Sequence, residues 1–261
     1  MSATSGTTHW LSKHTPNPDA ALRLFCFPYA GGFAGIFRGW SEALPSSVEV
    51  CAVQLPGRGP RWDEPNFTDL ALLIDIFAKE LRPFWDKPFA LFGHSMGAII
   101  SFELARYLRV QYGIEPLHLF VSASCAPNVP RHLLPSYDLS ATGYLETLRR
   151  LNGIPARVLE HEEAMKLLLP VLRADFQMIR TYTYRDATPL ACPITAFGGL
   201  SDEEVSTDCL SAWREQTAGR FSLKMIEGDH FFVQRAKPLL LKLLSEQLTE
   251  LVSEINDQRR S

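Results

Sequence analysis

Short apolar runs alternate with helical patterns along most of the chain. The runs that are long enough for buried strands lie at 22–27, 48–55, 89–92, 117–123, 194–197 and 221–226. Between them, apolar residues recur at spacings of three and four over 69–84 and 98–109, which is the period of a helix with one buried face. Residues 208–217 and 238–255 are further helix candidates. This alternation predicts an α/β fold in which a mostly parallel sheet is covered by helices on both faces.

One connection between predicted strands is much longer than a simple crossover requires. About 70 residues separate the strand at 117–123 from the strand at 194–197, whereas a crossover needs about a dozen residues and short loops. The excess, residues 127–187, contains helical patterns rich in Leu, Met and Phe, and Pro170 is expected to kink or divide the second of them. We interpret this segment as a helical lid over the functional site. A helical elaboration without a gating role is the alternative.

The remaining residues fall into a core and an extension. Residues 21–126 and 188–256 are expected to form the core into which the lid is inserted. Residues 1–20 are rich in Ser, Thr, Asn and Pro, so we expect a mobile N-terminal extension.

Composition limits the classes of function. The chain has 261 residues, of which 46% are hydrophobic, so a sizeable core can form without a metal or disulfides. A net charge of −3 gives no electrostatic case for binding nucleic acid or an anionic membrane. The five cysteines are scattered and none lies in a C-x-x-C pattern, so zinc is not expected. The N-terminus does not resemble a secretory signal and no apolar run reaches transmembrane length, so we expect a soluble cytoplasmic protein.

The pentapeptide Gly93-His94-Ser95-Met96-Gly97 lies between an apolar run and a helical pattern. A G-x-S-x-G sequence between a strand and a helix forms a nucleophile elbow, a sharp turn that exposes the serine hydroxyl. A serine hydroxyl is a weak nucleophile at neutral pH, so it needs a base to accept its proton and a third group to orient that base. The elbow therefore predicts Ser95 as a catalytic nucleophile, with a base and an acid elsewhere in the chain as its partners.

The partners are expected downstream, because in this arrangement an acid and then a histidine follow the serine. Of the seven histidines, only His230 lies in the loop after the last predicted strand, so we predict it as the base. Asp202 is the first carboxylate after the preceding strand and is the predicted acid, with Glu203 and Glu204 as alternatives. Asp229 adjoins His230, and adjacent residues rarely present the required geometry to each other.

A serine acyl-transfer site also needs two backbone N–H donors for the oxyanion. The first is the N–H of Met96, directly after the nucleophile. The second is expected from the loop after an early strand, and we assign the N–H of Ala30, with Tyr29 as the alternative. The glycines that follow at 31 and 32 allow the backbone to turn and to approach a ligand closely.

A second glycine-containing turn, QLPGRG at 54–59, is expected at the same edge of the sheet. Its Arg58 and the nearby Arg61 have the charge to meet an anionic group. We favour the simpler interpretation that both are solvated loop arginines.

Several segments taken together resemble a known family. They are FPYAGG at 27–32, QLPGRG at 54–59, FGHSMGA at 92–98 followed by FELAR at 102–106, GGLSD at 198–202 and GDHFF at 228–232. Over about residues 22–255 the chain resembles the type II thioesterases, which are stand-alone α/β-hydrolases associated with polyketide synthases and nonribosomal peptide synthetases. The resemblance implies an α/β-hydrolase fold, and it implies the same site residues, namely Ser95, Asp202 and His230, with Met96 and Ala30 as oxyanion donors. Position 229, often glycine in the family, is Asp here.

The resemblance implies a housekeeping activity. Such enzymes cleave stalled or wrong acyl groups from the phosphopantetheine arm of acyl or peptidyl carrier proteins. No metal or bound cofactor is expected, since phosphopantetheine belongs to the substrate, and a monomer is the default expectation. The nearest alternative is a medium-chain fatty acyl thioesterase that acts with a fatty acid synthase. An ester hydrolase, an acyltransferase or cyclising thioesterase, and a catalytically silent binding protein of the same fold are more distant.

Overall fold

The computed structural model describes residues 8–12, 15–130 and 160–260. Within these residues, seven strands form one sheet in the order β1-β3-β2-β4-β5-β6-β7. All neighbouring pairs are parallel except β1 and β3. The strands are β1 (Leu11–Ser12), β2 (Leu22–Phe27), β3 (Val48–Val53), β4 (Phe89–His94), β5 (His118–Ser122), β6 (Ile194–Gly199) and β7 (Phe221–Ile226). The six strands predicted from the apolar runs are all present, and the mostly parallel α/β fold is confirmed.

Helices connect the parallel strands, as the sequence pattern predicts. The α-helices are α1 (Trp40–Ala43), α2 (Leu70–Glu80), α3 (Met96–Tyr112), α6 (Glu162–Thr181), α7 (Thr207–Ser211), α8 (Phe232–Arg235) and α9 (Lys237–Gln258). Short 3-10 turns are η1 (Ala34–Phe37), η2 (Gly59–Arg61), η3 (Arg82–Phe84) and η5 (Ala212–Gln216). None of the helices described here is long and apolar enough to cross a membrane.

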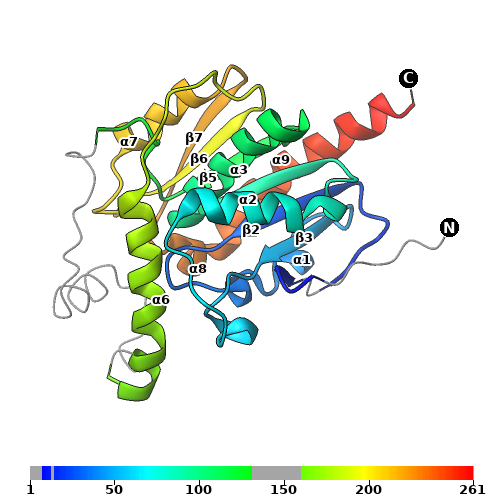
Figure 1. The fold of residues 1–261 in the computed structure, drawn as a ribbon. Helices are drawn as coiled ribbons and strands as arrows, with labels where there is room; N and C mark the ends of the chain where they lie inside the picture. The colour runs from blue at the N-terminus through cyan, green and yellow to red at the C-terminus, as the bar shows by residue number, and fades with distance from the viewer. Residues whose placement is uncertain (1–7, 13–14, 131–159, 261) are drawn as a thin grey trace.

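The two faces of the sheet are covered by different helices (Figure 1). Because side chains alternate along a strand, Leu22, Leu24 and Cys26 of β2 point to one face, where α1 and α9 complete a core. Phe25 and Phe27 point to the other face, which α2 and α3 cover. Burial on both faces explains why the strands appear in the sequence as nearly continuous apolar runs rather than as alternating patterns.

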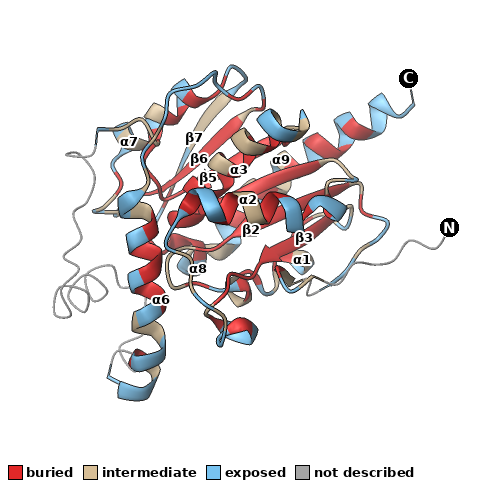
Figure 2. Cartoon of the chain, viewed as in Figure 1, coloured by how far each residue is buried: buried red, intermediate tan, exposed pale blue. Residues whose placement is uncertain are grey.

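Helix α6 lies across the edge of the sheet at which α8 is found (Figure 1). Its buried side faces the body of the molecule and its exposed side faces away (Figure 2). The expected division at Pro170 does not occur, because one helix runs from Glu162 to Thr181. Proline removes a single N–H from the helical ladder, and buried residues on both sides of it hold the helix against the core. The part of the expected lid at 131–159 lies outside the described residues.

Part of the N-terminal segment belongs to the sheet. Leu11 and Ser12 pair with the end of β3, and Trp10 is buried with its ring centroid 4.8 Å from that of Phe77. The guanidinium of Arg61 lies 4.0 Å from the centre of the Trp10 ring. The expectation of a mobile extension over 1–20 is therefore corrected for these residues. One aromatic side chain anchors a strand that is too short to give a pattern of its own.

Candidate active site

Ser95 occupies a strained turn between β4 and α3. Its backbone has φ 55° and ψ −116°, a conformation that costs about 1–3 kcal/mol for a residue with a side chain. The N–H of Ser95 donates to the carbonyl of Ser122 on the neighbouring strand β5 at 2.7 Å, which holds the turn. At Gly97, a Cβ atom would lie 2.2 Å from the carbonyl oxygen of Phe27. Glycine at that position lets the end of β2 approach the first turn of α3.

The structure brings Ser95, His230 and Asp202 together at the carboxyl edge of the sheet. The Nε2 of His230 lies 3.1 Å from the Oγ of Ser95, and its Nδ1 lies 2.9 Å from the Oδ2 of Asp202. A carboxylate can only accept, so Nδ1 carries the imidazole proton and Nε2 is free to accept from the serine hydroxyl. The Asp202 side chain is fully buried and that of His230 is 9% exposed.

The second carboxylate oxygen of Asp202 is held by the backbone. Oδ1 accepts the N–H groups of Glu204 at 2.9 Å and Val205 at 3.2 Å. These two bonds leave Oδ2 directed at His230. Asp229 instead accepts the N–H of Phe231 and pairs with the exposed Arg235. Of the candidate acids named from the sequence, Asp202 is therefore the one that the structure places against the histidine.

His94 holds the loop that carries His230. Its Nε2 lies 3.0 Å from the backbone carbonyl of His230 and its Nδ1 lies 2.8 Å from the Oγ of Ser122. Burial keeps the pKa of His94 well below its ordinary value of 6.5, so the ring is neutral. A neutral ring has one N–H, which donates to the carbonyl, while Nδ1 accepts from Ser122. From the sequence, His94 could be placed only as the neighbour of the serine, so its contact with the loop was not predicted.

The loop after β2 forms a tight turn beside the elbow. The N–H of Gly32 donates to the carbonyl of Tyr29 at 2.8 Å, and Gly31 has φ +77°. The N–H of Gly31 donates to Asp175 on α6. In the described part of the chain, the N–H groups of Ala30 and Met96 have no acceptor among the protein atoms. These are the two donors that the sequence assigned to an oxyanion.

Arg58 forms a buried ion pair, contrary to the expectation of a solvated side chain. Its guanidinium donates to both carboxylate oxygens of Asp175, at 2.5 and 2.8 Å, and the two side chains are 6% and 1% exposed. Arg61 is also buried, where it pairs with Glu64 and covers Trp10. Removing one partner of a buried pair costs about 3–5 kcal/mol. Both arginines therefore hold parts of the fold together and are not solvated loop side chains.

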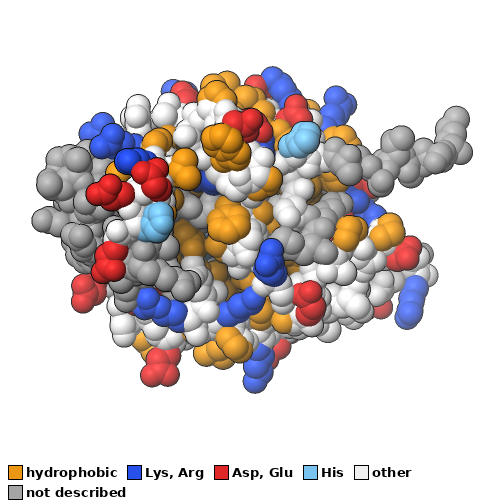
Figure 3. Space-filling view, turned by 90° about the horizontal axis from the view of Figure 1, so that it is seen from below, with side chains coloured by type: hydrophobic (Ala, Val, Ile, Leu, Met, Phe, Trp, Pro, Cys, Tyr) orange, Lys and Arg blue, Asp and Glu red, His pale blue; other side chains and the backbone are white. Residues whose placement is uncertain are grey.

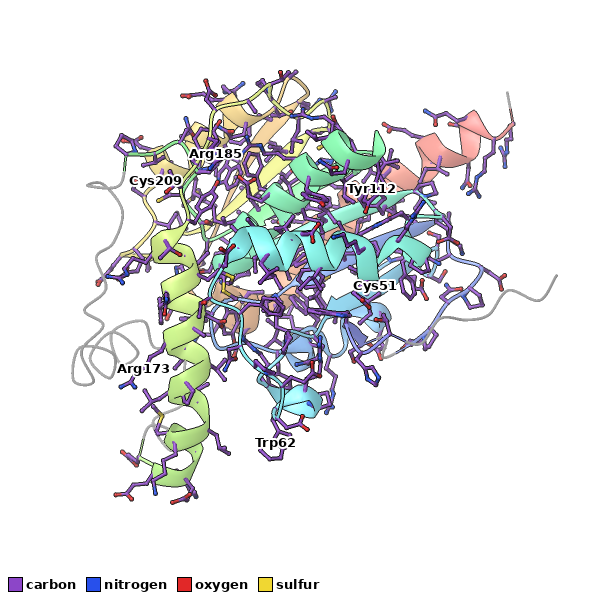
Figure 4. The ribbon with its side chains drawn as sticks, viewed as in Figure 1. Cys51, Trp62, Tyr112, Arg173, Arg185 and Cys209 are labelled. Atoms are coloured by element: carbon purple, nitrogen blue, oxygen red, sulfur yellow. The ribbon has the colours of Figure 1, made fainter. Side chains whose placement is uncertain are left out.

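An apolar cluster joins α6 to the loops of the site. Its buried members are Met165, Leu172, Phe176 and Phe231, with Tyr29, Ala30, Leu168 and Leu169 packed against them. Phe231 directly follows the histidine and Ala30 lies in the turn after β2, so α6 contacts both loops. Arg173, on the same helix, points away from the sheet (Figure 4). The inner side of the helix is therefore mostly hydrocarbon, with the paired carboxylate of Asp175 as its buried charge.

A doubly covered parallel sheet, a strained serine elbow and an aligned histidine and aspartate define an α/β-hydrolase of the serine type. The family model described as "Thioesterase domain" matches residues 22–255. The chain belongs to the thioesterase family and is a thioester hydrolase.

Individual relatives agree with this assignment. The chain is 46% identical over 253 residues to the gramicidin S biosynthesis protein GrsT of Aneurinibacillus migulanus, covering 95% of this chain and 97% of that protein. The solved structure of RedJ, a thioesterase of the prodiginine pathway in Streptomyces coelicolor, has a TM-score of 0.80 and 38% identity, covering 87% and 85%. The type II thioesterase BorB from the borrelidin cluster has a TM-score of 0.83 and 36% identity, covering 93% of this chain and 100% of that chain.

Proposed function

We propose that this protein hydrolyses acyl thioesters on the phosphopantetheine arm of carrier proteins, as an editing enzyme of polyketide or nonribosomal peptide synthesis. One observation carries the catalytic part, namely the 3.1 Å contact between Ser95 Oγ and His230 Nε2 with Asp202 behind the histidine. The likeness to proteins named for gramicidin and borrelidin biosynthesis supports the pathway part. The substrate enters with its own phosphopantetheine, so the enzyme supplies only side chains and backbone donors.

In the first half of the reaction, Ser95 attacks the thioester carbonyl. His230 accepts the serine proton through Nε2, and Asp202 stabilises the imidazolium that forms. The N–H groups of Met96 and Ala30 donate hydrogen bonds to the carbonyl oxygen, on which the negative charge develops. Removing one such donor typically lowers turnover by about 100-fold or more. The carbon–sulfur bond then breaks, and His230 returns the proton to the departing thiolate.

In the second half, water hydrolyses the acyl-Ser95 ester. His230 accepts a proton from water, and the same two N–H groups hold the second oxyanion. Collapse of this intermediate breaks the bond between the acyl carbon and Ser95 Oγ, and His230 returns its proton to that oxygen. The carboxylic acid is released and the serine hydroxyl is restored. Because a thiolate leaves more easily than an amine, the site needs little leaving-group assistance, which suits an enzyme that clears varied acyl groups.

The apolar cluster between α6 and the two loops is the proposed contact for the acyl chain. Leu172, Leu168 and Met165 extend along one side of α6. Leu172 and Leu168 lie beside the turn at Gly31. The face that carries the lower end of α6 has hydrophobic side chains near its centre and charges of both signs around them (Figure 3). The free energy of binding hydrocarbon to an apolar surface scales with the buried area and has no directional preference, so such a surface does not select one chemical structure.

The test is deacylation of a panel of acyl-carrier proteins, with the same acyl groups on N-acetylcysteamine as the small-thiol control. The proposal expects higher kcat/KM on the carrier-bound thioesters and activity on several acyl types. A preference confined to medium-length saturated chains would favour the fatty acid synthase alternative. Hydrolysis of simple esters but not of thioesters would contradict the proposal. Ser95→Ala serves as the matched inactive variant.

A further inference from the structure

The carboxylate of Asp175 joins three segments that are distant in the sequence. Its Oδ2 accepts the backbone N–H of Gly31 at 2.7 Å and a guanidinium N–H of Arg58 at 2.5 Å. Its Oδ1 accepts a second N–H of Arg58 at 2.8 Å. Arg58 also donates through Nε to the carbonyl of Pro56 at 3.1 Å. Helix α6, the turn after β2 and the turn after β3 therefore meet at one buried charge.

Asp175 accepts a hydrogen bond from the central peptide of the turn at 29–32, and the orientation of that peptide determines the type of turn. The Gly32 to Tyr29 hydrogen bond and the φ of +77° at Gly31 are those of a type II β-turn, with Ala30 and Gly31 at its centre. In such a turn the central peptide, Ala30–Gly31, can rotate by about 180° to give a type I turn. Asp175 accepts the N–H of that peptide, so rotation would bring the Ala30 carbonyl against a carboxylate.

The hydrogen bond that closes the turn fixes the direction of the Ala30 N–H. A peptide unit is planar and trans, so its C=O and N–H point in opposite directions. The Tyr29 carbonyl is held on one side by the Gly32 N–H, which leaves the N–H of Ala30 on the other. Gly97, in the first turn of α3, contacts the backbone at Phe27 and Pro28, so this loop lies beside the elbow.

We propose that Asp175 is a positioning residue for the oxyanion site. By accepting the Gly31 N–H it anchors the turn at 29–32 to α6, and the anchored turn carries the Tyr29–Ala30 peptide, which presents the Ala30 N–H to the reacting carbonyl. Arg58 neutralises the buried charge. This inference rests on the proposed function, since it assumes that Ala30 is an oxyanion donor. It also makes the docking of α6 a condition for a complete site, because the acceptor lies on that helix.

Two double variants separate the acceptor from the ion pair. In Arg58→Met with Asp175→Asn, a neutral side-chain oxygen remains to accept the Gly31 N–H. In Arg58→Met with Asp175→Leu, the side chain has nearly the same shape but no acceptor. Neither variant leaves an unpaired buried charge, so both are expected to fold. The substrate is an acyl-N-acetylcysteamine thioester, which needs no carrier-protein contact.

The Leu variant is expected to lose about 100-fold in kcat relative to the Asn variant, with little change in KM, which is the effect of losing one oxyanion donor. Inhibition by an alkyl trifluoromethyl ketone, which forms a tetrahedral adduct with the serine, should weaken by the same factor. The pH at which kcat/KM falls on the acidic side should be unchanged, because His230 and Asp202 are untouched. Equal kcat values for two folded variants would overturn the proposal.

A measurement on the unaltered protein covers the case in which a variant fails to fold. The Gly31 amide should exchange slowly with solvent and should have a downfield proton shift, since it donates to a buried carboxylate. Exchange as fast as that of an open loop amide would overturn the proposal. Failure of the proposed function would look different. The wild-type protein would then not hydrolyse thioesters at all, while Gly31 exchange and trifluoromethyl ketone binding would still report on the turn.

Discussion

The Oδ2 of Asp202 lies 2.9 Å from the Nδ1 of His230, and the position of this oxygen is set by its partner oxygen on the same carboxylate. Oδ1 is occupied by the backbone N–H groups of Glu204 and Val205, which can only donate. The carboxylate therefore cannot rotate without giving up two hydrogen bonds. The geometry fixes both the tautomer and the orientation of the imidazole that faces Ser95.

Replacing Asp202 by Asn should leave the fold intact and lower kcat by about 10³–10⁴-fold. The amide oxygen will take the place of Oδ1, because only it can accept the two backbone N–H groups. The amide NH2 will then face Nδ1 of His230 and will favour the tautomer that carries its proton on Nε2. In that tautomer the histidine cannot accept the serine proton.

Steady-state kinetics with a thioester substrate measures this loss, and thermal unfolding serves as the control for folding. A wild-type rate in Asp202→Asn would mean that another group orients the histidine. Glu203→Gln and Glu204→Gln would then be the variants to compare.

Ser95→Ala and His230→Ala are each expected to remove nearly all hydrolysis, a loss of at least about 10³-fold, because members of a catalytic triad act as a unit. Combining them should cost little more than either alone. A fluorophosphonate probe should label the wild-type protein and should not label Ser95→Ala. Labelling that persists in the alanine variant would place the reactive serine elsewhere in the chain.

Bulky substitutions on the inner side of α6 should change the preference for acyl-chain length. Leu168 packs into the apolar cluster and lies near the turn at Gly31, so Leu168→Trp should lower kcat/KM for long acyl chains at least about 10-fold more than for acetyl. Leu167 is on the same helix but is 69% exposed, so Leu167→Trp is the matched control. Unchanged relative rates across chain lengths in Leu168→Trp would remove α6 from the acyl site.

Stability should fall with acid through His118, which is outside the active site. This ring is stacked on Phe120 and its Nε2 lies 2.9 Å from the Oγ1 of Thr195. Burial lowers the pKa of His118 from 6.5 to about 4, so the folded protein favours the neutral ring. Below pH 6.5 the unfolded chain binds the proton more readily, and stability is lost progressively down to about pH 4.

The pH dependence can be isolated by comparing the wild type with His118→Asn. Between pH 7 and pH 5 the free energy of unfolding of the wild type should fall by about 2 kcal/mol more than that of the variant. Urea unfolding at the two pH values measures this difference. Parallel losses in the two proteins would show that His118 is not the group that titrates.

Much of the fold could be predicted from local sequence. Strand β2 begins and ends where its apolar run does, because both faces of the strand are buried and Pro28 follows it. The elbow, Asp202 and His230 could be placed because each lies directly after a predicted strand, and parallel strands deliver their following loops to one edge. Strand β1 could not be predicted, since two residues give no period.

The buried charges could not be predicted, because their partners are distant in the chain. Arg58 lies in a polar turn that resembles any exposed loop, and its partner is 117 residues away. One signal was nevertheless present. Asp175 falls three residues after Leu172 and directly before Phe176, so it interrupts the apolar side of α6. An acidic residue on the buried side of a helix requires a cationic partner, and the loop arginines Arg58 and Arg61 were candidates for it.

The central claim is that Ser95 accepts the acyl group from the thioester, and trapping the intermediate tests it most directly. Wild-type protein would be mixed with an acyl-carrier protein, quenched in acid within milliseconds to seconds, digested and analysed by mass spectrometry. We predict a transient mass increase equal to the acyl group on the peptide that contains Ser95, with release of the carrier thiol, and neither event in Ser95→Ala. Hydrolysis with no acylated Ser95 peptide at any time, together with a wild-type rate in Ser95→Ala, would contradict the account.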